Sequence, residues 1–238
     1  MASTKMTMKG LSYLLVLLGS VCSALAEESV ESTKVVRCSF IHWDGVPEEG
    51  YYFRMNDEFL PIKFEKENRS KSISVMRMEK IEVFHKLEGS SSGQLSYELV
   101  ADALIPMHMS EVMFLILSPD LANEGKHRVI VIADSAQAFP SASCLFLNLC
   151  SDVFDVDFAG EIERLQPERV KVIFSKVGKK GGFVPCMINT QDGERVFENR
   201  IFCQKSSRRC VIIRPNIKGD LMPPRIKFLS QYLPVEQY

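Results

Sequence analysis

Residues Phe139–Pro167 read FPSASCLFLNLCSDVFDVDFAGEIERLQP, and this stretch decides the fold class. An apolar run follows Pro140, a polar break interrupts it, and an alternating segment then runs from Val153 to Phe158. Alternation of apolar and polar residues with a period of two is typical of half-buried β-strands. We therefore predict that this stretch forms the opening hairpins of a β-sandwich.

The rest of the chain repeats this pattern over its 238 residues. Short apolar runs such as Arg128–Ala133 and Cys210–Arg214, the last clear strand, are bounded by turn-forming residues. Hairpins are predicted across Asn56–Asp57 and across Gln191–Gly193, which contains an Asp-Gly turn signal. No segment has an extended helical stripe of apolar residues, and many short strands with frequent turns indicate an all-β sandwich or barrel.

The best boundary between domains is Asp134–Ala142, which is small, polar and contains Pro140. We predict an all-β fold of two consecutive antiparallel, immunoglobulin-like β-sandwich domains, residues 35–134 and 139–238. A short internal similarity supports two related halves, because Cys38–His42 (CSFIH) resembles Cys144–Asn148 (CLFLN).

The N-terminus has the features of a targeting segment. Positive charges at Lys5 and Lys9 precede the apolar run Leu11–Leu18, and Ala24–Ala26 forms an A-x-A cleavage signal. We predict a signal peptide over residues 1–26, cleaved after Ala26, and a secreted or periplasmic mature protein. The alternative is an uncleaved anchor. No second long apolar segment follows, so we expect the mature chain not to span a membrane.

The formal net charge of -1 provides no global basic field, so the sequence gives no reason to expect a nucleic-acid partner. The cysteine content has two interpretations, because removal of the signal peptide leaves six cysteines in an oxidising compartment. Cys203 and Cys210 bracket a polar turn and are candidates for a disulfide across a hairpin. The alternative is that the cysteines are free, buried and apolar in character.

The block around Phe139–Pro167 resembles a pattern in uncharacterised secreted bacterial β-sandwich proteins, F-P-x-G-S, F-x-N-L-S and L-x-P-G. It is also distantly similar to periplasmic β-sandwich modules that accompany alginate acetylation. Ala142 and Glu168 stand where the pattern has glycine, and Cys150 stands where it has serine. The resemblance implies a secreted β-sandwich and no catalytic residue. The residues themselves give Asn148, Gly160 and Pro167 structural roles in turns and at a strand edge.

The chain contains His42, His85, His108 and His127, but no zinc-protease, nucleophile-elbow, phosphate-loop or dinucleotide-binding motif. The sequence therefore predicts no catalytic residue and no cofactor. One metal hypothesis is a Cu(I) site formed by Met107, His108, Met109 and Met113, with Met76 and Met78 nearby, because thioether and imidazole ligands suit Cu(I). The alternative is that these methionines fill the core.

Two basic turns are candidates for binding an anionic glycan or a lipid head group. One contains Lys176, Lys179 and Lys180, and the other contains Arg208 and Arg209. We expect a non-catalytic, envelope-associated binding or structural module whose partner is an envelope protein or an anionic glycan. The alternatives are a periplasmic copper-binding accessory protein and a hydrolase with an unrecognised site.

Overall fold

The computed structural model describes residues 35–43, 50–65, 69–87, 96–119, 127–178, 180–216 and 223–232. The predicted signal peptide lies outside these residues. Sixteen strands make up the described regular structure, and they divide into two sets of eight. The first set is β1 Val35–His42, β2 Tyr51–Met55, β3 Glu58–Pro61, β4 Ile73–Met76, β5 Lys80–Leu87, β6 Ser96–Leu104, β7 Glu111–Leu117 and β8 Arg128–Ala133. The second set is β9 Ser143–Asn148, β10 Phe154–Phe158, β11 Glu161–Leu165, β12 Val170–Phe174, β13 Gly182–Thr190, β14 Arg195–Cys203, β15 Ser207–Arg214 and β16 Arg225–Tyr232.

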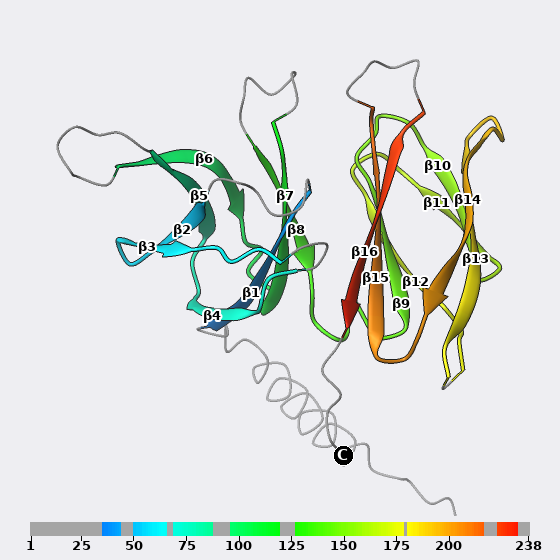
Figure 1. Cartoon of the computed structure of the whole chain (residues 1–238), viewed down its shortest axis with the longest axis horizontal. Helices are drawn as coiled ribbons and strands as arrows, with labels where there is room; N and C mark the ends of the chain where they lie inside the picture. The colour runs from blue at the N-terminus through cyan, green and yellow to red at the C-terminus, as the bar shows by residue number, and fades with distance from the viewer. Residues whose placement is uncertain are drawn as a thin grey trace, which may run out of the picture. The chain divides into compact units, whose positions relative to one another are not determined.

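Each set forms two four-stranded sheets, which we call inner and outer (Figure 1). In the first set the inner sheet has the order β4-β1-β7-β8 and the outer sheet β3-β2-β5-β6. In the second set the inner sheet has the order β12-β9-β15-β16 and the outer sheet β11-β10-β13-β14. The prediction of an all-β fold is confirmed, and the sheets form two pairs, which we call the first and second sandwich.

The two sandwiches have the same topology, because adding eight to each strand number of the first gives the strand orders of the second. The residue pairing agrees as well. Cys38 pairs with Ile73 across β1 and β4, and Cys144 pairs with Ile173 across β9 and β12. Both outer sheets also have an irregularity at the same place, after Val83 in β5 and after Ile188 in β13. Residues with the same place in the pairing are called matched positions below.

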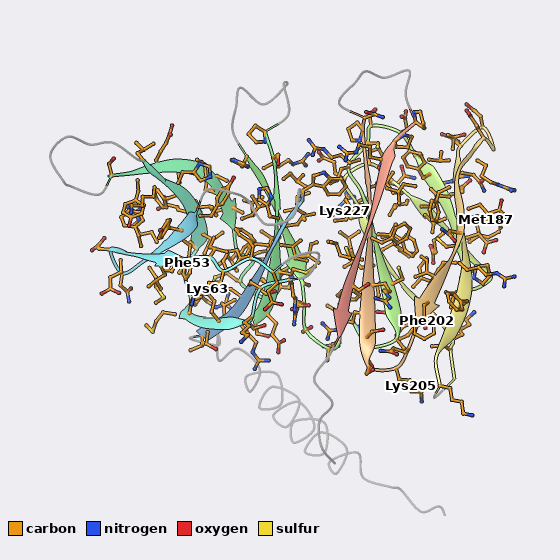
Figure 2. The ribbon with its side chains drawn as sticks, viewed as in Figure 1. Phe53, Lys63, Met187, Phe202, Lys205 and Lys227 are labelled. Carbon is orange, nitrogen blue, oxygen red and sulfur yellow. The ribbon has the colours of Figure 1, made fainter. Side chains whose placement is uncertain are left out.

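Three apolar cores hold the sheets together. Phe40, Phe53 and Phe114 lie in the core of the first sandwich, and Figure 2 labels Phe53 between its sheets. The core of the second sandwich contains Phe146 and Phe158. A third, central core joins the two inner sheets, so strands such as β9 and β15 are buried along their whole length. Burial on both faces explains the uninterrupted apolar runs Cys144–Leu147 in β9 and Cys210–Ile213 in β15, which do not alternate with polar residues.

The central core also contains the single tryptophan, and cationic side chains lie over its ring. Trp43 is buried beside Leu145 and Ile212. The ammonium of Lys227 lies 5.3 Å from the centre of its ring, and Figure 2 labels this lysine on β16. The residues from Val35 onward form one compact unit. We expect burial of this third core to couple the unfolding of the two sandwiches. The boundaries of the two predicted domains stay a prediction.

The inner sheets differ from the prediction of purely antiparallel sandwiches. β1 pairs with β7, and β9 with β15, in parallel. A parallel pair needs a long connection between its strands, and in both halves five strands intervene. All other strand pairs in the described sheets are antiparallel.

Individual strands confirm and correct the prediction. Both predicted hairpins form, with Asn56 and Asp57 at positive φ in the first and Gly193 at positive φ in the second. The strand-like stretch from Ser74 to His85 is divided between β4 and β5, which lie in different sheets. Cys210–Arg214 is not the last strand, because β16 follows the two prolines at 223 and 224. Prolines directly before a strand do not interrupt its hydrogen bonds.

The predicted disulfide between Cys203 and Cys210 is wrong in this structure, where all six described cysteines are free thiols. The connection between them is not a hairpin, because β14 belongs to the outer sheet and β15 to the inner sheet. Cys203 faces the core of the second sandwich, whereas Cys210 faces the central core on the other side of the inner sheet. In the described part of the chain, no helix has the length and apolar character needed to cross a membrane.

Candidate functional site

Three of the four histidines meet around Tyr51 at one end of the first sandwich. His42 is the last residue of β1, Tyr51 is the first residue of β2, and His127 directly precedes β8. His85 pairs with Tyr51 across β2 and β5. These strand termini meet because β1 runs parallel to β7 while β2 runs antiparallel to β5. We call these four residues the histidine–tyrosine cluster.

The side chains of the cluster are in mutual contact. The ring centre of Tyr51 lies 4.0 Å from that of His85, 5.3 Å from that of His127 and 5.4 Å from that of His42. The Tyr51 hydroxyl lies 2.9 Å from Nε2 of His127, and Nδ1 of His127 lies 3.1 Å from the carbonyl oxygen of Leu117. A carbonyl only accepts, so we assign the proton of neutral His127 to Nδ1, and Tyr51 donates to Nε2.

The cluster has two buried members and two that are more accessible. His42 and Tyr51 are only 7% and 4% exposed, whereas His85 and His127 are half-buried. Glu98 lies opposite His85 in the pairing of β5 and β6 and is exposed. A ligand at this end of the sandwich would therefore meet two imidazoles and a carboxylate, and behind them a tyrosine whose hydroxyl is held by hydrogen bonding.

The second sandwich builds the matched positions without any of these side chains. The residues matched to His42, Tyr51, His85 and His127 are Asn148, Phe154, Thr190 and Pro224. Asn148 stabilises the strand end by donating to the carbonyls of Asp152 and Leu165 and accepting from the amide of Cys150. This confirms the turn-forming role predicted for Asn148. The second sandwich therefore fills these four positions without ionisable side chains, so the architecture itself does not require the histidine–tyrosine cluster of the first sandwich.

The sequence contains little signal for this cluster. The histidines have no motif spacing, and they converge only through the pairing of strands that are far apart in the chain. The one available signal is position, because His42 and His85 lie at or near strand ends and His127 lies at the start of a strand. In the described ranges, no three histidine, cysteine, aspartate or glutamate side chains have a geometry that holds a metal ion.

The four predicted copper ligands are not brought to one point. Met107 is 67% exposed and His108 is also exposed, at a turn. Met109 packs against the core of the first sandwich, whereas Met113 is buried in the central core. Met109 and Met113 therefore lie in cores on opposite faces of the inner sheet.

Met76 and Met78 lie elsewhere, beside a surface pocket of about 310 Å³ that Arg77 and Lys80 also line. The methionines named with the copper hypothesis are thus spread over the surface and two separate cores.

The two predicted basic turns also differ from expectation. Arg208 and Arg209 are buried, and Nε of Arg209 donates to the carbonyl of Phe202 at 2.9 Å. Lys176 pairs with Glu161 at 2.7 Å between Nζ and Oε1, and Lys179 lies outside the described residues. Both arginines are therefore turned into the interior, on opposite faces of β15. Arg208 lies beside the central core, whereas Arg209 faces the outer sheet of the second sandwich.

None of the six cysteines in the described ranges has the environment of a nucleophile. Burial raises the pKa of Cys38, Cys150, Cys186 and Cys210 to about 12. Burial also raises the pKa of Cys203 and, to a greater extent, that of Cys144. The thiolate is the reactive form, so these thiols are protonated and unreactive at neutral pH.

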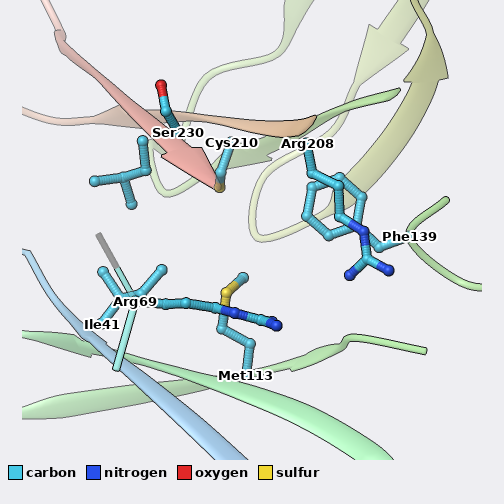
Figure 3. Close-up of a pocket in the computed structure, with 8 residues that line it drawn as sticks. Ile41, Arg69, Met113, Phe139, Arg208, Cys210 and Ser230 are labelled. Atoms are coloured by element: carbon cyan, nitrogen blue, oxygen red, sulfur yellow. The ribbon is translucent and has the colours of Figure 1, made fainter. Parts of the chain in front are cut away.

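A charged group lies at the junction of the sandwiches. Asp134, at the end of β8, binds Nη1 of Arg208 through Oδ1 at 2.9 Å and pairs with Arg69 through Oδ2. The Arg208 guanidinium also lies 5.1 Å from the centre of the Phe139 ring. Figure 3 shows Arg69 and Arg208 extending from different elements toward the same region. Burial raises the pKa of Asp134, and the charges of the two arginines oppose that rise.

Comparison with known proteins gives no assignment. No protein-family model matches the chain, and no curated protein sequence matches it. The resemblance of the Phe139–Pro167 block to secreted bacterial proteins accordingly stays a prediction.

Proposed function

We propose that the chain is a non-catalytic binding protein of a secreted or periplasmic compartment, built from two immunoglobulin-like sandwiches. In this proposal the histidine–tyrosine cluster contacts the ligand, and the second sandwich serves as a scaffold. The difference between matched positions carries the proposal. His42, Tyr51 and His85 occupy places that the second sandwich fills with uncharged residues of ordinary packing or turn-forming character. Binding residues are commonly found at the loop-bearing ends of sandwiches.

The chemistry of the cluster favours an anionic glycan as ligand. Imidazoles and a phenol hydroxyl offer donors and acceptors to sugar hydroxyls. Imidazole is also the side chain that gains positive charge between about pH 8 and pH 5, which would attract the carboxylates of uronic acids. Glu98 is the charged group opposite His85 and would contact a sugar hydroxyl rather than a carboxylate. Binding should therefore tighten as the pH falls.

A swap between matched positions tests this function. A triple variant, His42→Asn, Tyr51→Phe and His85→Thr, places in the first sandwich the residues that the second sandwich already uses. We expect this variant to fold and to lose binding to a short oligomer of uronic acid, measured by calorimetry at about pH 5.5 and about pH 7.5. The wild type should bind more tightly at the lower pH. A matched control is His108→Asn, which changes an exposed histidine outside the cluster.

Other outcomes distinguish the alternative functions. Equal binding by the wild type and the triple variant would contradict a role for the cluster. Stoichiometric copper after Cu(I) loading, lost on Met107→Leu with His108→Asn, would favour the copper-binding alternative. Turnover of ester or glycoside substrates by the wild type, absent in the triple variant, would favour a hydrolase.

A further inference from the structure

A small cavity of about 10 Å³ lies between the two sandwiches, next to Arg208 (Figure 3). Most of its wall consists of apolar side chains from the central core, including Met113 and Leu229. The polar side chains that line it are Arg69, Arg208, Cys210 and Ser230. Apart from the Ser230 hydroxyl, these side chains present donors, because guanidinium groups cannot accept and a protonated thiol accepts only weakly.

The positive charge of Arg208 is only partly neutralised within this junction. Its Nη1 donates both to the side chain of Asp134 at 2.9 Å and to the backbone carbonyl of the same residue at 3.1 Å. Asp134 is shared with Arg69, so one carboxylate serves two guanidinium groups. Arg208 is only 6% exposed, and its Nε atom is buried without a hydrogen-bond partner in the described structure.

An unpartnered donor on a buried cation is costly, and the pKa of Arg208 reflects this environment. Burial lowers that pKa, Asp134 opposes the shift, and the charge of Arg69 lowers it further. A second anion beside Arg208 would satisfy the Nε donor and offset the remaining positive charge. A water molecule would be a poorer occupant, because it also needs acceptors for its own hydrogens.

We infer that this cavity binds one monatomic anion, chloride in physiological solution, with Nε of Arg208 as a principal donor. The size of the cavity selects the class of ligand. A volume of about 10 Å³ is close to the minimum that holds one water molecule, so phosphate, sulfate and organic acids do not fit. A chloride ion, which is slightly larger than water, fits when the flexible side chain of Met113 in the wall moves outward. The anion would lie between strands of both inner sheets and stabilise their association. This site is separate from the histidine–tyrosine cluster and goes beyond the proposed function.

The response of thermal stability to chloride tests the inference. The midpoint of unfolding is measured in sodium chloride and in sodium gluconate, each at about 0.2 M so that screening is equal. A ligand that binds only the folded state raises the midpoint by mass action, by about 3 °C when its concentration is about ten times its Kd. Bromide should replace chloride and give an anomalous scattering peak at the cavity in crystals soaked with sodium bromide.

Two variants of one residue separate a specific site from a general effect of salt. Cys210→Leu places a larger apolar side chain beside the cavity and should abolish the difference between chloride and gluconate. Cys210→Ser leaves the cavity slightly larger and keeps a hydrogen-bond donor, and should retain that difference. Equal midpoints of the wild type in both salts, with water in the cavity and no bromide peak, would overturn the inference. So would a chloride effect that persists unchanged in Cys210→Leu.

Discussion

Arg208, near the start of β15, donates two hydrogen bonds to Asp134, which directly follows β8. Its Nη1 donates both to the side-chain oxygen Oδ1 and to the backbone carbonyl of Asp134. The two residues belong to different sandwiches, and Arg69 completes the group from the connection between β3 and β4. All three lie beside the central core rather than at an exposed edge. The junction therefore combines burial of apolar surface with one charged contact that fixes how the inner sheets meet.

Replacement of Asp134 should reveal the strength of this contact. Asp134→Asn removes the shared negative charge and leaves two guanidinium groups close together in a buried place. Loss of one partner from a buried ion pair costs about 3 kcal/mol or more, so we expect the free energy of unfolding in urea to fall by that amount. The matched control is Asp155→Asn, which breaks the exposed pair with Arg164. That control should cost less than about 1 kcal/mol.

Alkaline pH should destabilise the protein through its buried thiols. Burial raises the pKa of thiols such as Cys38 and Cys150 to about 12 in the folded state, whereas unfolded thiols titrate near about 8.5. Between these values the folded state binds more protons than the unfolded state. The contribution of these thiols to the free energy of unfolding is therefore constant below about pH 8.5 and is lost as the pH rises toward 12.

A single substitution isolates one thiol from the other groups that titrate at alkaline pH. Cys38→Ala should weaken the pH dependence by up to about 1.4 kcal/mol per pH unit across this window, measured by urea unfolding at several pH values. If the free energy of unfolding of the variant falls with pH as steeply as that of the wild type, burial does not raise the pKa of Cys38. A thiol reagent at neutral pH should modify the described cysteines only after unfolding.

Ala142 offers a stabilising substitution. Its φ of 58° lies in the left-handed region, which disfavours residues with a side chain. The resemblance pattern has glycine there, and Glu168, its second departure from glycine, also has a positive φ of 57°. We expect Ala142→Gly to raise the free energy of unfolding by about 0.5 to 1 kcal/mol. Ala138→Gly, at an exposed position without positive φ, should not stabilise.

The sequence predicts most strands because alternation and turn chemistry are local. The hairpin at Asn56–Asp57 is an example, since both turn residues adopt the positive φ that such turns need. The CSFIH and CLFLN similarity also locates true matched positions, because Cys38 and Cys144 have equivalent pairing. These features need no knowledge of distant contacts.

The features that the sequence does not predict are those that depend on which sheet each strand joins. The Cys203–Cys210 pairing fails because β14 and β15 lie in different sheets, although the polar turn between them resembles a hairpin tip. Arg208 and Arg209 were predicted to form a basic turn that binds a ligand, yet both are buried, Arg208 beside the central core and Arg209 against β14. The histidine–tyrosine cluster cannot be predicted from the sequence for the same reason, because its members meet through long-range strand pairing that no local pattern encodes.

The central core should make the two sandwiches unfold together. Leu147 is buried there with 1% of its side chain exposed, and it pairs with Ile212 of β15. Leu147→Ala should lower the free energy of unfolding by about 2 to 5 kcal/mol. It should also shift a single transition seen equally by Trp43 fluorescence and by circular dichroism. Ile162→Ala, at a position that is 73% exposed, is the control and should have little effect. If Leu147→Ala instead separates the Trp43 signal from the loss of β-structure, the sandwiches are independent folding units and the central core does not couple them.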